Sequence, residues 1–254
     1  MFVDSHCHLD FPELAGQLAA VLELMQANEV ERALCVSVTL EDFPRVRELA
    51  ETHEQLHASV GVHPDYDGVA AVSHAELVVL ARHPRIVAIG ETGLDYYRLK
   101  GDLEWQRERF RTHIRAAREC GRPLIIHTRA AAADTLHIMR EEGAREVGGV
   151  MHCFTEDWKT AQAAIDMGFY ISFSGIITFK NATALRDVAR QVPLQKMLIE
   201  TDAPFLAPVP HRGKTNQPGY VRHVAEEIAR LKDVPLEQVA RATTDNFYRL
   251  FNIV

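Results

Sequence analysis

The chain has 254 residues, of which 47% are hydrophobic and 25% are charged, and its net charge is -7. This composition is typical of a soluble globular protein with a large core and excludes disordered and fibrous classes. The negative charge argues against a protein that coats long stretches of nucleic acid, because such binding depends on many phosphate contacts. It leaves open an enzyme that holds a strand end, where bound divalent cations supply local positive charge.

The sequence gives no sign of export or membrane insertion. No apolar run reaches the length of a membrane span, and residues 1–10 lack the basic start and apolar middle of a signal peptide. The cysteines are too few and too scattered for a disulfide framework, so we predict reduced thiols at Cys7, Cys35, Cys120 and Cys153. We therefore expect a cytoplasmic protein, and nothing in the sequence points to an obligate protein partner.

Short β-rich runs alternate with longer helical patterns, without a linker or a break in composition. Strands are predicted at residues 2–4, 33–38, 56–60, 86–89, 123–126, 149–151, 170–173 and 196–199. Apolar residues three and four apart predict helices at 14–26, 103–118, 131–141, 158–167 and 221–231, with the C-terminal stretch as a further helix. Eight strands joined by helices predict a single α/β domain over residues 1–254, a (β/α)₈ TIM barrel. An open doubly wound sheet is the alternative.

Potential metal ligands follow five of the predicted strands. His6 and His8 come after the first strand, where strand alternation puts them on one face and Cys7 on the other. Four further residues follow the fourth, fifth, sixth and eighth strands: Glu91, His127, His152 and Asp202. Each alone is easily an ordinary surface or core residue, but the C-terminal ends of barrel strands converge on one mouth. Four histidines and two carboxylates there are enough for two divalent ions.

Six motifs are spread over the chain, and five of them contain these residues. In order these are Asp4-Ser5-His6-Cys7-His8-Leu9-Asp10, Gly61-Val62-His63-Pro64, Gly90-Glu91-Thr92-Gly93-Leu94-Asp95-Tyr96-Tyr97, His127-Thr128-Arg129, His152-Cys153-Phe154 and Glu200-Thr201-Asp202-Ala203-Pro204. With these segments the sequence resembles the TatD family of metal-dependent deoxyribonucleases, amidohydrolase-like barrels, over essentially its whole length. The resemblance implies that His6, His8, Glu91, His127, His152 and Asp202 bind the metals, with Glu91 as the bridge between them.

Such a centre predicts hydrolysis of a phosphodiester. Water held between two cations loses its proton near neutral pH, and the same cations neutralise a phosphate oxygen. Asp202 is the candidate general base, and Glu91 shares the catalytic role as bridging ligand. The resemblance implies a 3′–5′ exodeoxyribonuclease acting on DNA strand ends, with RNA as a second candidate substrate. The ions are Mg²⁺, Mn²⁺ or Zn²⁺, and the sequence does not choose among them.

Two other functions remain open at this point. One is hydrolysis of another ester or amide, such as an aminoacyl ester on RNA, with the same metal-activated water. The other is a non-catalytic metal-binding protein, which is disfavoured because an open mouth leaves room for water and substrate.

Several residues are candidates for substrate contact. By position, His63 and Arg129 point into the mouth, where phosphate binding and structural hydrogen bonding are equally good explanations. The resemblance favours substrate contact for the loop 210–216, which carries His211 and Arg212 after the last strand. Base stacking and ordinary packing remain open for Tyr96, Tyr97 and Trp105.

One motif is rejected. Residues 53–57 match the zinc-protease pattern of two histidines four apart on a helix, with a glutamate between them. The predicted strand 56–60 would break that helix, so we predict no metal site there.

Overall fold

Eight parallel strands form the centre of the computed structural model, which describes residues 1–69 and 72–253. They are β1 (Phe2–Cys7), β2 (Val30–Cys35), β3 (Leu56–Val60), β4 (Ile86–Asp95), β5 (Leu124–Arg129), β6 (Gly149–Met151), β7 (Tyr170–Phe173) and β8 (Met197–Ile199). Their order in the sheet is their order in the chain, and each neighbouring pair is parallel. The predicted TIM-barrel fold is confirmed, and the doubly wound alternative is wrong because the strand order never reverses.

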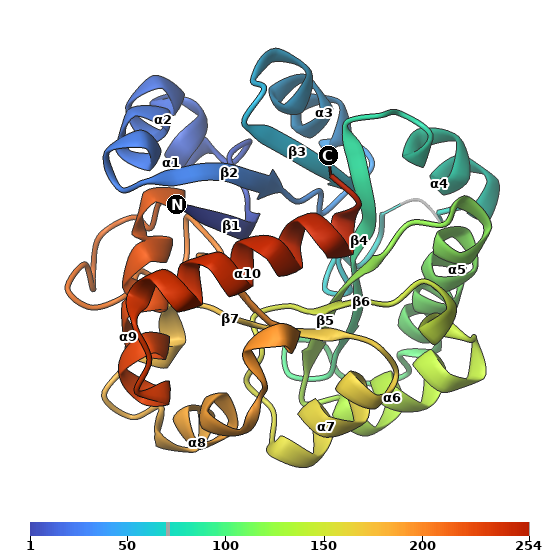
Figure 1. Ribbon diagram of the computed structural model, residues 1–254. Helices are drawn as coiled ribbons and strands as arrows, with labels where there is room; N and C mark the ends of the chain where they lie inside the picture. Colours follow the sequence, from blue (N-terminus) through green and yellow to red (C-terminus); the bar gives the residue numbers. More distant parts are fainter. Residues whose placement is uncertain (70–71, 254) are drawn as a thin grey trace.

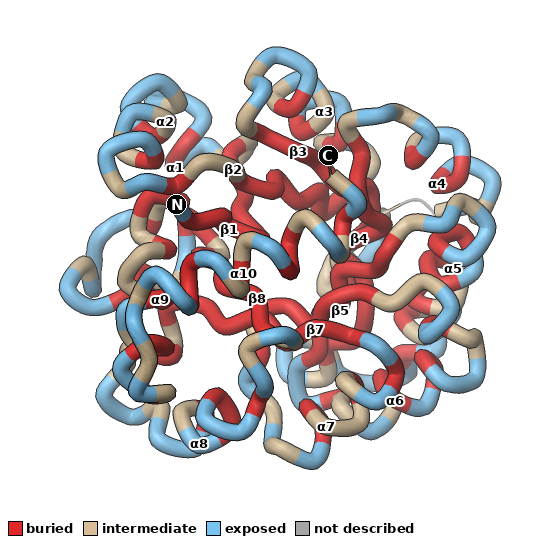
Figure 2. The backbone as a smooth tube through the Cα atoms, viewed as in Figure 1, coloured by how far each residue is buried: buried red, intermediate tan, exposed pale blue. Residues whose placement is uncertain are grey.

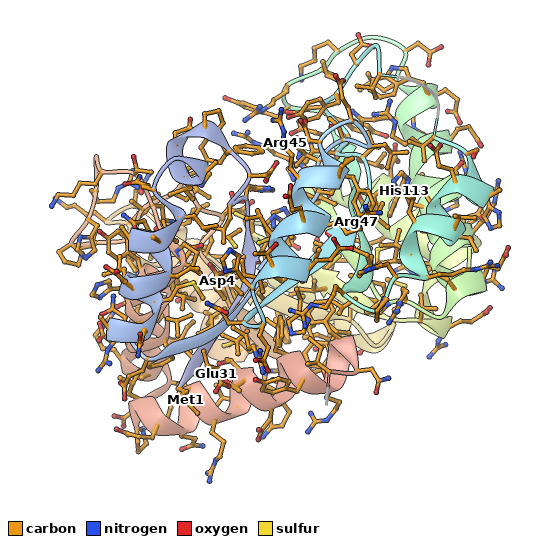
Figure 3. All side chains as sticks on the ribbon, turned by 90° about the horizontal axis from the view of Figure 1, so that it is seen from above. Met1, Asp4, Glu31, Arg45, Arg47 and His113 are labelled. Atoms are coloured by element: carbon orange, nitrogen blue, oxygen red, sulfur yellow. The ribbon has the colours of Figure 1, made fainter. Side chains whose placement is uncertain are left out.

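The barrel closes between β8 and β1 mainly through the segment after β8. Cys7 forms a parallel bridge with Ala203, and the amide of Asp202 donates to the carbonyl of His6 at 3.0 Å. Asp4, labelled in Figure 3, adds a side-chain link, because its carboxylate accepts from the amide of Thr201 at 2.9 Å. The seam therefore joins the first and last motifs of the chain, 197 positions apart.

Helices surround the strands, as Figure 1 shows. They are α1 (Pro12–Ala15), α2 (Leu18–Ala27), α3 (Phe43–Thr52), α4 (His74–Ala81), α5 (Glu104–Cys120), α6 (Ala132–Glu141), α7 (Trp158–Asp166), α8 (Thr183–Gln191), α9 (Val221–Lys232) and α10 (Leu236–Phe251), with short 3₁₀ turns η1 (Ala144–Glu146), η2 (Gly175–Thr178), η3 (Leu194–Lys196) and η4 (Pro218–Tyr220). The helix predicted over 14–26 is wrong as a single element: it is broken at Gly16, a residue of low helix propensity, and Gln17.

The core has two layers, and buried backbone fills the centre of Figure 2. The larger layer lies between the strands and the surrounding helices. The smaller layer fills the barrel with side chains such as Leu34, Ile125 and Leu198. Helix α10 runs across one end of the barrel in Figure 1, where Phe247 and Phe251 pack against this inner layer. These rings close the end of the barrel opposite the mouth.

The predicted boundaries of four strands are corrected by the structure. Strands β1, β4 and β5 continue beyond the predicted ends at residues 4, 89 and 126, into the motifs that follow them. Strand β2 occupies Val30–Cys35, three residues earlier than the predicted 33–38. The apolar runs mark the buried middle of a strand, and pairing carries the backbone further than those runs extend.

Three other expectations can be compared with the structure. All four cysteines are free thiols, as predicted. His53 follows the end of α3 and His57 lies within β3, so the rejection of the zinc-protease pattern is confirmed. Over residues 1–69 and 72–253, none of the helices combines the length and hydropathy needed to cross a bilayer.

A buried histidine makes stability sensitive to acid. His113, on α5 and labelled in Figure 3, is fully buried. Its Nε2 accepts from the amide of Val62 at 3.0 Å, while its Nδ1 donates to the carbonyl of Arg109 at 2.8 Å. Burial and the charge of Arg109 lower the pKa of His113 to about 4, from an ordinary 6.5. Protonation would also set an N–H against the amide of Val62.

We expect His113 to lower the free energy of unfolding as the pH falls from 6.5 to 4, because the unfolded chain binds the proton first. At 1.36 kcal/mol for each unit, the full loss is about 3 kcal/mol. Urea unfolding at pH 7 and pH 4.5 should show a smaller acid loss in His113→Gln than in the native chain. The exposed His137, changed to Gln, is the control. An equal acid loss in His113→Gln and the native chain would contradict the assignment.

Candidate metal centre

Irregular pairing in two strands shapes the site. On β1, Asp4 and Cys7 are three residues apart, whereas their partners on β2, Ala33 and Cys35, are two residues apart. On β4, the stretch that contains Glu91 carries a similar extra residue relative to β5. Such bulges bend a strand and redirect its side chains. They fall at His6 and Glu91, so local backbone geometry positions both side chains at the mouth.

A glycine lets β4 and β5 pass close together beside the site. Gly93 has a φ of +137°, and a Cβ there would lie 2.0 Å from the carbonyl oxygen of His127. No side chain fits in that space, and the conformation itself favours glycine. Gly93 therefore allows the close pairing that holds His127 next to Glu91.

Glu91 lies at the centre of a cluster of imidazoles, and its side chain is 3% exposed. Its Oε2 is 3.3 Å from Nε2 of His6 and 4.0 Å from Nε2 of His8. Its Oε1 faces three further rings: His63 Nε2 at 3.2 Å, His127 Nδ1 at 3.2 Å and His152 Nε2 at 2.8 Å. The two oxygens of one carboxylate thus face two groups of nitrogen atoms.

Asp202 completes the cluster from the segment after β8. Its Oδ1 lies 3.7 Å from Nε2 of His6 and 3.5 Å from Nε2 of His8. Its backbone is in the left-handed region, at φ +58°. The ligand atoms of three sets of residues lie within 4.8 Å of one another: His6, His152 and Asp202; His6, His8 and Glu91; and His63, Glu91 and His127. All six predicted metal ligands are therefore brought together.

Outer partners fix the direction of four of the rings. These contacts are His8 Nδ1 to Val36 O at 3.0 Å, His63 Nδ1 to Asp65 Oδ1, His127 Nε2 to Asp95 Oδ2 at 3.2 Å, and His152 Nδ1 to Glu200 Oε1 at 3.1 Å. Each outer nitrogen donates its hydrogen away from the cluster, which leaves the lone pair of the other nitrogen directed inward. No role for these acidic partners was predicted from the sequence, although Asp95 and Glu200 stand inside two of the six motifs.

The electrostatics keep both carboxylates ionised. Burial alone would raise the pKa of Glu91, but the surrounding imidazoles, His152 first, hold it well below its usual range. Burial likewise opposes ionisation of Asp202, and its hydrogen bond with His8 outweighs that effect and lowers the pKa. The cluster therefore offers two ionised carboxylates to a cation.

These residues fit divalent cations. Nε2 of His152 is a buried atom with no hydrogen-bond partner among the described residues, although it points toward Glu91. A buried nitrogen of this kind calls for an electron-pair acceptor. Imidazole and carboxylate donors together suit ions such as Zn²⁺ or Mn²⁺. A coordinated cation would satisfy both the orphaned nitrogen and the two carboxylates.

The residues predicted to contact substrate lie in different surroundings. His63 belongs to the cluster itself, through its contact with Glu91. Arg129 ends β5, and its guanidinium lies 4.0 Å from the centre of the Tyr97 ring, which is 62% exposed. The other two contact their own loop and its neighbours: His211 stacks on Tyr220 at 3.8 Å, and Arg212 lies 3.8 Å above the Phe179 ring and donates to Ala207 O at 2.7 Å. Only His63 is therefore placed directly against a predicted ligand.

The structure also shows the surroundings of the three aromatic candidates and of Cys7. The hydroxyl of Tyr96 donates to Asp134 at 2.7 Å, and Trp105 lies beneath the guanidinium of Arg109 at 4.7 Å, so both rings are held in the fold. Cys7 is buried and donates to the carbonyl of Leu34, away from the imidazoles, as strand alternation predicts. Tyr97 alone of the three aromatic candidates is freely exposed.

Known proteins match this chain over nearly its whole length. Residues 3–252 match the model of a family described as TatD related DNase. The sequence is 50% identical to the uncharacterized metal-dependent hydrolase YcfH of Escherichia coli K12, across 99% of this chain and 96% of that protein. It is 42% identical to YabD of Bacillus subtilis, named likewise, across the full length of both. The crystal structure of YjjV, a TatD homolog from Escherichia coli K12, superposes with a TM-score of 0.92 at 31% identity, covering 100% of this chain and 98% of that one.

Proposed function

The chain belongs to the TatD family and is a metal-dependent hydrolase, and from this premise we propose that it cleaves phosphodiester bonds of DNA. The proposed reaction removes nucleotides from the 3′ end of a strand. Two divalent cations, which Glu91 and the other predicted ligands would hold, are the proposed cofactor. The proposed location is the cytoplasm, with which the four free thiols agree.

One observation carries the proposal: two ionised carboxylates face inward-directed imidazoles at the mouth of the barrel. When bound, divalent cations activate water and neutralise charge on a phosphate. A phosphodiester is a substrate that needs both effects, because it is anionic and resists attack by neutral water. Because the chain as a whole is negatively charged, an anionic substrate needs the local positive charge that bound cations would supply.

Glu91, Asp202 and Arg129 have different roles in the proposed reaction. Glu91 is almost fully enclosed, so its role is to hold the two ligand groups at a fixed separation. The side chain of Asp202 is 17% exposed, which leaves it in reach of an entering water. Asp202 orients that water, accepts its proton and passes the proton toward the leaving oxygen. Arg129 lies at the end of β5 and offers a guanidinium to the phosphate chain.

The proposal predicts stepwise shortening of single-stranded DNA labelled at its 5′ end. The purified protein, stripped with a chelator, should be inactive and should regain activity with Mg²⁺, Mn²⁺ or Zn²⁺. Metal analysis of the active protein should find close to two ions for each chain. No cleavage with any metal would contradict the nuclease assignment, and release of an aminoacyl group from RNA by the same preparation would favour the ester alternative.

A further inference from the structure

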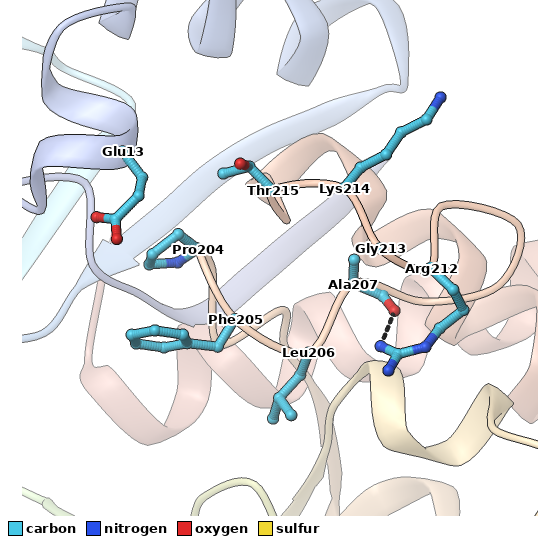
Figure 4. A pocket seen from close by; sticks show the side chains of 9 residues that line it. All are labelled: Glu13, Pro204, Phe205, Leu206, Ala207, Arg212, Gly213, Lys214 and Thr215. Atoms are coloured by element: carbon cyan, nitrogen blue, oxygen red, sulfur yellow. Dashed lines mark hydrogen bonds between the residues drawn. The ribbon is translucent and has the colours of Figure 1, made fainter.

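A cavity of about 430 Å³ lies between the segment that follows β8 and the loop after it. One side is the segment from Pro204 to Ala207, which directly follows Asp202 and the barrel seam. The other side is the loop that carries Arg212 and Lys214, and Glu13 of α1 lies across from that loop in Figure 4. The cavity is therefore built from parts of the chain that already border the candidate ligands.

A row of aromatic rings connects the cavity to the centre. His8 stacks on Phe11 with a centroid distance of 4.8 Å, and Phe11 meets Phe205 edge to face at 6.0 Å. The amide of Phe205 also donates to the carbonyl of Asp202 at 2.9 Å. Phe205 is thus linked to two of the predicted ligands, to His8 through the ring of Phe11 and to Asp202 through a backbone hydrogen bond.

The walls of the cavity differ in chemistry. Phe205 is 50% exposed, which is unusual for a large apolar side chain, and it leaves a ring surface open to a ligand. Lys214 is exposed and makes no ion pair with any residue of 1–69 or 72–253, and in Figure 4 it extends outward from the loop. Glu13 would repel a phosphate, so its side of the cavity suits the edge of a base. Arg212 is already held by Ala207 and Phe179.

We propose that this cavity binds one nucleotide of single-stranded DNA next to the scissile bond. The base stacks on Phe205, on the Glu13 side, and the phosphate chain passes on the Lys214 side. An aromatic ring next to a cation is the usual means of holding a single strand without reading its sequence. This inference rests on the proposed nuclease function and adds to it a subsite and the residues that form it.

The first test compares two substrates in Phe205→Ala. For a single-stranded oligonucleotide, KM should rise about 5- to 150-fold, since stacking on an aromatic ring is of that strength. For a small chromogenic phosphodiester, which is too short to reach the cavity, kcat and KM should not change. Phe205→Trp should restore the oligonucleotide KM. Val79→Ala, an exposed apolar change on α4, is the matched control.

An abasic series identifies the base that stacks. In the native protein, loss of one particular base near the 3′ end should raise KM as much as Phe205→Ala does. In Phe205→Ala, the same abasic substrate should show no further rise. Independent, additive effects would overturn the stacking assignment.

The salt dependence of KM tests the contact between Lys214 and the phosphate chain. Lys214→Ala should lower the slope of log KM against log salt concentration by about 0.7, the value for one phosphate contact on a single strand. The control is Arg145→Ala, on the 3₁₀ turn η1, which lines a second cavity of about 450 Å³ between α6 and α7 at the opposite end of the barrel. An unchanged slope in Lys214→Ala would remove that residue from the subsite.

The outcomes separate this inference from the proposed function. If the native protein hydrolyses the small phosphodiester but no oligonucleotide, the DNA assignment fails. If it hydrolyses the oligonucleotide and Phe205→Ala leaves KM unchanged, the nuclease function stands and the subsite is wrong.

Discussion

Glu91→Gln is expected to lower phosphodiester hydrolysis by about 10³-fold or more, since a metal centre contributes several kcal/mol to the transition state. The substitution keeps the size of the side chain and removes its charge. Glu91 takes part in two of the three ligand sets, so its loss weakens both at once. An amide presents one oxygen where the carboxylate presents two, and the nitrogen would face imidazole lone pairs at about 3 Å.

Metal content is the second measurement on Glu91→Gln. We expect the purified variant to hold less than half of the divalent ion of the native protein after the same dialysis, with an unchanged circular dichroism spectrum. Glu142→Gln is the matched control, because Glu142 is also largely buried and pairs with Arg115 between α5 and the end of α6. That variant should lose some stability and no activity. Full activity in Glu91→Gln would remove the carboxylate from the centre.

The sequence predicts the barrel well because its strands are buried on both faces. Strands β3, β6 and β7 match their predicted bounds, since each is short, buried at every residue and followed by a polar or turn residue. The position of α10 was not predictable in this way. Its apolar spacing indicates a helix with one buried face, but only the assembled barrel has an open end for Phe247 and Phe251 to close.

The sequence predicts which residues gather at the site better than it predicts how their side chains are oriented. Position after a strand was enough to place the six predicted ligands at one mouth, because parallel strands end there, and the family resemblance selected them among the other polar residues at strand ends. His63 was assigned to substrate contact, yet its ring faces Glu91 at 3.2 Å with Asp65 behind it. Sequence spacing does not show which side of a loop faces a cluster. The bulges on β1 and β4 were equally hidden, because an extra residue in one strand is defined only by its partner.

Asp202→Asn is expected to lower kcat by about 10²- to 10⁴-fold, the usual contribution of a positioned general base. The KM for an oligonucleotide should change little, because Asp202 acts on the water and the strand is held elsewhere. Asparagine is the right replacement, since the backbone at 202 has a φ of +58° and asparagine tolerates the left-handed region where alanine is strained. The amide oxygen also keeps an acceptor facing His6 and His8.

Comparison with Asp202→Ala separates the proton transfer from the geometry. Both variants should keep the fold, since the amide of residue 202 still bonds to the carbonyl of His6, and both should be inactive to a similar degree. Asp202→Ala should melt at a lower temperature than Asp202→Asn, because only alanine adds backbone strain. If Asp202→Asn retained native kcat while Asp202→Ala lost it, the side chain would serve as a ligand through its oxygen, and the proton would leave by another residue.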